Sequence, residues 1–167
     1  IRKSGFVPRT AVVQTGQVVE LRFAGSYHEP HFHPVSNLDL GTDFLSRKTG
    51  KLARRFSRVE PIPMLVACDN HPAHRALVHV LDHPFGTITS DNGEFRLNAV
   101  PRGKVPLTIW HEATGYVKRE LVVDVREGKT VNVGTISISA KHLAEDRQTL
   151  QPNPLERDDS IHDKKVP

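Results

Sequence analysis

The sequence contains only one cysteine, Cys68, among its 167 residues. An intrachain disulfide is therefore impossible, and neither a disulfide framework nor a cysteine-only zinc site can organise the fold. Any chemistry that Cys68 performs must draw on partners other than a second sulfur. The chain has ten histidines, and they are the natural candidates for those partners.

Long apolar runs and clustered aromatic residues are also missing. No run approaches the roughly 20 apolar residues that a membrane-spanning helix requires, so we expect no integral membrane segment. Aromatic residues make up 6% of the chain, which is too few for base stacking, and the lysines and arginines behind the net charge of +4 are scattered. Nucleic acid is therefore not an expected partner. The densest basic stretch, residues 48–58, is interpreted as a solvated loop.

Short runs rich in β-branched residues, separated by glycine-containing turns, dominate the rest of the chain. Their length and spacing predict an all-β protein of the sandwich type. Asn92-Gly93 lies between two alternating segments, which predicts a tight hairpin with positive φ at both turn residues. Residues 43–56 are the longest helical candidate, but their apolar spacing is loose and Gly50 interrupts it, so we expect a short helix there at most. The predicted strands are residues 10–13, 18–23, 64–67, 76–81, 86–89, 94–97, 106–110, 120–125 and 130–139.

The composition also divides the chain into three parts. A histidine-rich part gives way to a hairpin-rich part near His83-Pro84, which predicts domains over residues 1–83 and 84–140. Beyond them, residues 141–167 are polar and charged with several prolines, and the alternation has stopped. Such a tail cannot bury enough apolar surface to order itself, so we expect it to be disordered or laid along another surface.

One thiol and two imidazoles are concentrated in a segment of seven residues, Cys68-Asp69-Asn70-His71-Pro72-Ala73-His74. A predicted strand precedes this segment and another follows it. A strand, a tight loop and a returning strand would bring Cys68, His71 and His74 to the same end of a sandwich, where a metal ion could close the loop. Nucleophilic catalysis by Cys68 is not expected, because no oxyanion-hole loop is recognisable.

A second histidine cluster lies upstream, and any of its three members could supply a further imidazole from across the sheet. These histidines are His28, His31 and His33. One sulfur and two or three nitrogen ligands suit copper, with zinc as the main competitor because it also accepts cysteine and histidine.

From about Gly5 to Val117 the chain resembles plastocyanin-like cupredoxins, specifically the bacterial forms with a Cys-x-x-His-Pro motif. The matching segments are Phe6-Val7-Pro8, residues 16–21, residues 60–63 and residues 68–74. The resemblance implies a cupredoxin-like Greek-key β-sandwich, with copper held by a loop histidine, by Cys68 and by His71. We prefer His31 as the loop ligand, because the prolines on either side of His31-Phe32-His33 resemble the family's first-ligand turn; His28 and His33 are the alternatives.

The chain departs from this family at the axial ligand. Where the family has a methionine the chain has His74, and its sole methionine, Met64, lies back in the preceding strand. An imidazole is a stronger donor than a thioether, so an axial His74 predicts a lower reduction potential and a more tetragonal copper site. The alternative is that His74 points outward and the axial position is empty.

The second half of the chain resembles the carboxypeptidase-regulatory-like, transthyretin-like β-sandwich. The matching segments are residues 89–97, residues 100–103 and Gly115-Tyr116. These are turn and core positions without a donor cluster of their own. The resemblance therefore implies a second sandwich joined to the first, and no activity.

Together these features predict a small exported copper protein, periplasmic or secreted, that transfers electrons or handles copper with a redox partner protein. The resemblance supports this setting, and the chain opens with Ile1 rather than Met, which we interpret as processing or excision. An enzyme is the less expected alternative: a copper site with an open position for small-molecule redox chemistry. The third hypothesis is a metal-free β-sandwich that serves as an interaction module.

Overall fold

The computed structural model describes residues 1, 5–23, 28–38 and 50–138. These residues form an all-β structure without an α-helix, as the sequence predicts. The described part accordingly contains no helix that could span a membrane. The predicted polar tail, residues 141–167, lies outside the described residues.

The chain divides into two compact units, Ile1–Ala99 and Val100–Pro167. The division falls later than the expected boundary at residue 83, and residues 84–99 belong to the first unit. Gly86 shows why, since a Cβ at this position would lie 2.5 Å from Cγ1 of Val12. The backbone at Gly86 is therefore packed directly on the first unit.

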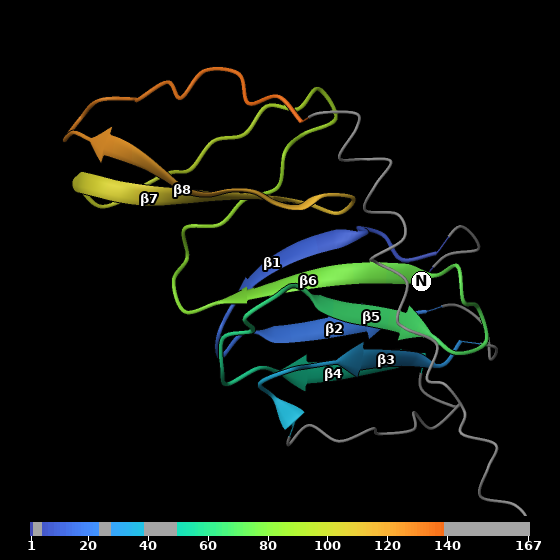
Figure 1. Ribbon diagram of the computed structural model, residues 1–167. Helices are drawn as coiled ribbons and strands as arrows, with labels where there is room; N and C mark the ends of the chain where they lie inside the picture. The colour runs from blue at the N-terminus through green and yellow to red at the C-terminus, as the bar shows by residue number, and fades with distance from the viewer. Residues whose placement is uncertain (2–4, 24–27, 39–49, 139–167) are drawn as a thin grey trace, which may run out of the picture. The chain divides into compact units, whose positions relative to one another are not determined.

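The described residues of the first unit form two sheets (Figure 1). Four strands form one sheet in the order β1-β6-β5-β3, in which β1 runs parallel to β6 and the other neighbours are antiparallel. The second sheet pairs β2 with β4 in antiparallel orientation. The strands are β1 (Thr10–Gln14), β2 (Val18–Arg22), β3 (Pro30–His33), β4 (Lys51–Arg55), β5 (Met64–Cys68) and β6 (Arg75–Leu81).

Side chains from both sheets share one hydrophobic core. Alternate residues of β5 are buried, so that Met64, Val66 and Cys68 face inward together. From the other sheet, Leu21 of β2 packs against this cluster, and Phe56, directly after β4, is fully buried in it. Two sheets with a common core between them are the arrangement expected of a β-sandwich.

The helical candidate contains a strand at its C-terminal end. Residues 51–55 form β4, with Leu52 only 4% exposed, whereas residues 43–49 lie outside the described part. The local pattern does not choose between helix and strand, because Leu52 and Phe56 lie four positions apart and fit both periods. β2 supplies the strand partner that the backbone needs. Long-range strand pairing therefore outweighs a weak local preference for helix.

Over residues 100–138, the described part of the second unit, β7 (Gly103–His111) and β8 (Gly115–Val125) pair as a hairpin. Within the described part of the chain, no strands form at three predicted places, residues 86–89, 94–97 and 130–138. The second sandwich that the resemblance implies stays a prediction.

The turn predicted at Asn92-Gly93 is present with a different geometry. Gly93 has φ +82°, but Asn92 is not among the residues with positive φ. The amide of Gly93 donates to the carbonyl of Ser90, and the amide of Ser90 donates to the carbonyl of Glu94. This is the pattern of a type I turn followed by a left-handed glycine, in which Asn92 needs no positive φ. The side-chain oxygen of Asn92 accepts the amide of Glu94 and supports this turn.

A buried carboxylate holds the end of the first unit where β3 ends and β5 begins. Glu60 is 6% exposed and accepts hydrogen bonds from the backbone amides of Val35, Ser36 and Asn37 and from the Asn37 side chain. Burial alone would raise the pKa of Glu60, but the hydrogen bonds from Asn37, Val35 and Ser36 outweigh it and lower that pKa. The loop after β3 is thus held by a charged group that is fully hydrogen-bonded.

Candidate metal centre

The pairing of β3 with β5 brings two distant segments of the chain together. In this antiparallel pair Pro30 lies opposite Cys68, so the chain enters β3 at the same end at which it leaves β5. His28 lies two positions before Pro30, and the amide of Asp69 donates to the carbonyl of Glu29. The register therefore places His28 beside Cys68.

Two consecutive turns position the other histidines. The amide of His71 donates to the carbonyl of Cys68 at 3.0 Å, and the amide of His74 donates to the carbonyl of His71 at 2.8 Å. Each bond closes a four-residue turn, and Pro72 occupies the position at which such turns favour proline. The spacing of three residues thus folds the segment back on itself twice. It gathers Cys68, His71 and His74 at one end of the sandwich, as the sequence predicts.

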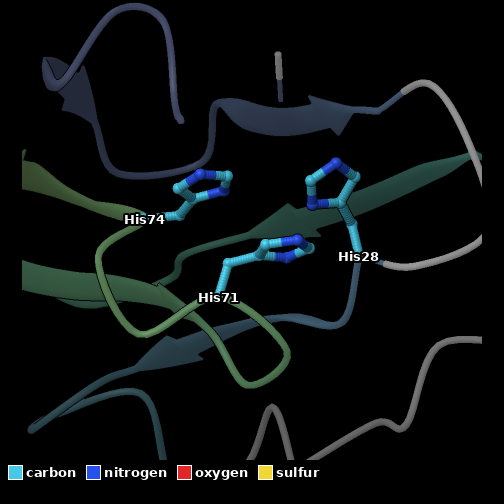
Figure 2. Close-up of side chains that lie close together, drawn as sticks. All are labelled: His28, His71 and His74. Carbon is cyan, nitrogen blue, oxygen red and sulfur yellow. The ribbon is translucent and has the colours of Figure 1, made fainter. Parts of the chain in front are cut away.

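The sulfur of Cys68 lies between two imidazoles. Its Sγ is 3.5 Å from Nδ1 of His71 and 3.8 Å from Nδ1 of His28, and the cysteine is only 2% exposed. His28, His71 and His74 each offer a ring nitrogen, and these three atoms lie within 4.8 Å of one another. Figure 2 shows the rings of His71 and His74 rising from the loop between β5 and β6, with His28 approaching from the segment that leads into β3.

The imidazole of His74 faces the other two rings. It stacks on His71 with ring centroids 4.7 Å apart and an angle of 9° between the planes. On its other side the chain passes close by at Gly5, where a Cβ would lie 3.5 Å from Cδ2 of His74. The Nδ1 atom of His74 is buried and has no hydrogen-bond partner among the described residues. A buried nitrogen of this kind is unfavourable unless something binds it, and a metal ion would do so.

The surroundings of His28 lower its pKa and so favour the neutral imidazole. Burial lowers the pKa of His28, and the neighbouring charges of His71 and His74 lower that pKa further. A lowered pKa means that the ring is neutral near pH 7, and the neutral imidazole is the form that binds metals.

The structure brings His28 rather than His31 to the cluster. Pro30 and Phe32 of β3 turn toward the core, where the ring of Phe32 packs edge-on against Phe56 with centroids 5.3 Å apart. Because side chains alternate along a strand, His31 and His33 point to the opposite face of the sheet. There Nε2 of His31 lies 2.9 Å from Oδ2 of Asp69.

The preference for His31 as the loop ligand thus finds no support in the geometry, because the cluster contains the alternative, His28. The flanking prolines suggested His31, but the alternation of the strand decides which side of the sheet each residue occupies. The sequence itself carries a signal for this. Pro30 and Phe32 are the apolar members of the strand, so His31, which lies between them, faces the other side.

Two sulfur–nitrogen pairs of the cluster have the spacing that a small metal ion requires. With metal–sulfur and metal–nitrogen bonds of about 2.3 and 2.0–2.1 Å, sulfur and nitrogen ligands of one ion lie about 3.5–3.8 Å apart for angles of about 110–120° at the ion. The two sulfur–nitrogen distances in this cluster, 3.5 and 3.8 Å, match that separation. The three imidazoles alone form the group whose donor atoms all lie within 4.8 Å of one another, and the Cys68 sulfur joins it through its contacts with His71 and His28. Thiolate and imidazole are both ligands that copper and zinc accept. The residues present therefore fit such an ion.

Comparison with known proteins adds no identification. No protein family matches this chain, and no curated protein sequence matches it significantly. The function has to be argued from the cluster itself.

Proposed function

We propose that this protein binds a single copper ion through Cys68, His28, His71 and His74, and that it transfers electrons or handles copper. The observation that carries the proposal is the position of the Cys68 sulfur, buried and within 3.8 Å of imidazole nitrogens from two separate segments of the chain. The buried Nδ1 of His74, which has no hydrogen-bond partner in the part of the chain that the structure describes, supports a fourth ligand. The resemblance to cupredoxins supports copper over zinc, since it includes the Cys68-x-x-His71-Pro72 motif.

We propose further that the first unit is a cupredoxin-like Greek-key sandwich. A cupredoxin-like Greek-key sandwich would carry its cysteine ligand at the end of a strand and the next ligand in the following loop. Cys68 ends β5, His71 lies in the loop before β6, and the sheet order β1-β6-β5-β3 includes a parallel pair. A protein of this kind would work in the periplasm or outside the cell with a redox partner protein.

Bound copper would supply one-electron redox chemistry, and the chain's own residues would control the environment of that chemistry. Cys68 is 2% exposed and belongs to the same buried apolar cluster as Val66 and Phe56, so little water reaches the sulfur. The lowered pKa of His28 keeps its imidazole unprotonated and able to bind at neutral pH. The paired strands β3 and β5 hold His28 and Cys68 in a fixed relation, which limits rearrangement of the ligands when the charge of the ion changes.

Metal titration with spectroscopy tests the proposal. We expect one equivalent of Cu(II) to produce an intense visible absorption band from charge transfer between the Cys68 thiolate and copper, and Cys68→Ser to abolish that band. His79, on β6 away from the cluster, offers a matched control, so His79→Gln should leave the band unchanged. If zinc binds at one equivalent but copper gives no such band, the site is a zinc site. If neither binds and a thiol reagent titrates Cys68 freely, the protein is a metal-free module.

A further inference from the structure

We propose that His31 and Asp69 form a positioning contact that fixes the Cys68 turn to the strand carrying His28. The inference rests on the proposed function, because it concerns the same metal site. Neither side chain belongs to the donor cluster. Nε2 of His31 lies 2.9 Å from Oδ2 of Asp69, and the His31 side chain is 11% exposed whereas that of Asp69 is 56% exposed.

The two residues connect the segments that hold the ligands. Asp69 directly follows Cys68, and His31 lies on β3, three positions after His28. Asp69 is joined to the β3 segment twice: its amide donates to the carbonyl of Glu29 at 3.1 Å, and its carboxylate meets His31. The backbone bond joins the residue after Cys68 to the residue after His28. The side-chain contact joins the same two segments on the other face of the sheet. We call these two contacts together the Asp69 joint.

The position of the Asp69 joint explains why it should affect metal binding. β3 begins and β5 ends at this point, and the terminal residues of strands fray because fewer hydrogen bonds hold them. A metal site tolerates ligand displacements of only about 0.2–0.5 Å. The sulfur of Cys68 and the ring of His28 come from different strands, so their separation depends on this joint. His31 is therefore a positioning residue that acts through Asp69 on Cys68.

Copper dissociation from the full chain tests the inference. We expect His31→Phe and Asp69→Ala each to speed the release of copper to a chelator about tenfold, in the range that residues behind metal ligands typically contribute. The charge-transfer band should shift in both variants. His33→Phe is the matched control, since His33 shares the strand and the face of His31 but is exposed. The double variant should lose little more than either single one.

A second measurement needs no metal. In the metal-free chain, the buried Cys68 thiol should react several-fold faster with a thiol reagent in His31→Phe and Asp69→Ala than in the wild type or His33→Phe, because the turn over the sulfur opens more often. Equal thiol rates in all four proteins would overturn the inference, and so would an equal increase in His33→Phe. If the wild type binds no copper, the proposed function fails, and the thiol rates alone then decide whether the contact positions Cys68.

Discussion

The sulfur of Cys68 and Nδ1 of His28 lie 3.8 Å apart, although 40 positions separate them in the chain. Their approach depends on the antiparallel register of β3 and β5, in which Pro30 faces Cys68. A shift of that register by one residue would turn His31 toward the core and His28 away from it. The identity of the third histidine in the cluster is therefore a consequence of strand pairing.

Removing His28 should weaken metal binding more than any other change in the upstream histidine cluster. His28→Ala deletes a donor nitrogen, so we expect copper affinity to fall more than about a hundredfold, beyond the range of residues behind the ligands. His33→Ala should leave affinity unchanged, because this side chain lies on the opposite face of β3. Competition with a chelator of known affinity measures both. A larger loss of copper affinity in His31→Ala than in His28→Ala would contradict the assignment of His28 as a ligand.

Replacing His74 by methionine should change the electronic character of the site. A thioether donates more weakly than an imidazole, so the His74→Met variant should have a higher reduction potential than the wild type and a narrower copper hyperfine splitting. Voltammetry and electron paramagnetic resonance of the copper-loaded proteins measure these properties. Identical spectra for the two proteins would mean that His74 is not a ligand.

Small anions test whether a coordination position is open. With His74 bound, azide should leave the absorption spectrum of the Cu(II) protein unchanged, because no position is free. In His74→Ala the vacated position should admit azide and shift the spectrum. A shift already in the wild type would favour an enzyme with an open copper site over an electron carrier.

Acid should destabilise the first unit through Glu60. Hydrogen bonds hold the pKa of this buried carboxyl below its usual value of 4.5. Its contribution to the free energy of unfolding is therefore fully present above the unfolded-state pKa and is lost as the pH falls through the lower folded-state pKa. Urea unfolding of the metal-free protein at several pH values measures this loss.

Glu60→Gln is the control for that experiment. At pH 7 we expect it to lower the free energy of unfolding by about 1–3 kcal/mol, since it removes charge-assisted hydrogen bonds to Asn37 and its neighbours. The difference between wild type and variant should shrink below about pH 4.5, where the unfolded-state carboxyl takes up a proton. A difference that stays constant from pH 7 to pH 3 would contradict the assigned role.

Copper should stabilise the fold by mass action. At a free concentration one hundred times the dissociation constant, a ligand that binds only the native state adds about 2.7 kcal/mol to the free energy of unfolding. Thermal or urea unfolding with and without copper measures this gain, and a chelator should reverse it. Cys68→Ser should show a much smaller gain. An equal gain in that variant would mean that copper binds elsewhere.

The sequence by itself determined the features that depend on near neighbours. Alternating apolar residues predict most strands of the first unit, since burial of one face needs a period of two. The three-residue spacing of Cys68, His71 and His74 defines two successive turns. These turns are local, so they bring the three residues close together without contacts to distant parts of the chain. The turn at Gly93 was also predictable, although its type depends on hydrogen bonds to Ser90 and Glu94.

Only the tertiary structure decided what depends on distant pairing. Residues 51–55 become a strand because β2 is available to them, which their local pattern does not reveal. His28 joins the cluster, and His31 meets Asp69 instead, because the register of β3 against β5 assigns each residue to a face. That register is set by the burial of Phe32 and Pro30 in a core contributed by both sheets, so no stretch of the sequence specifies it alone.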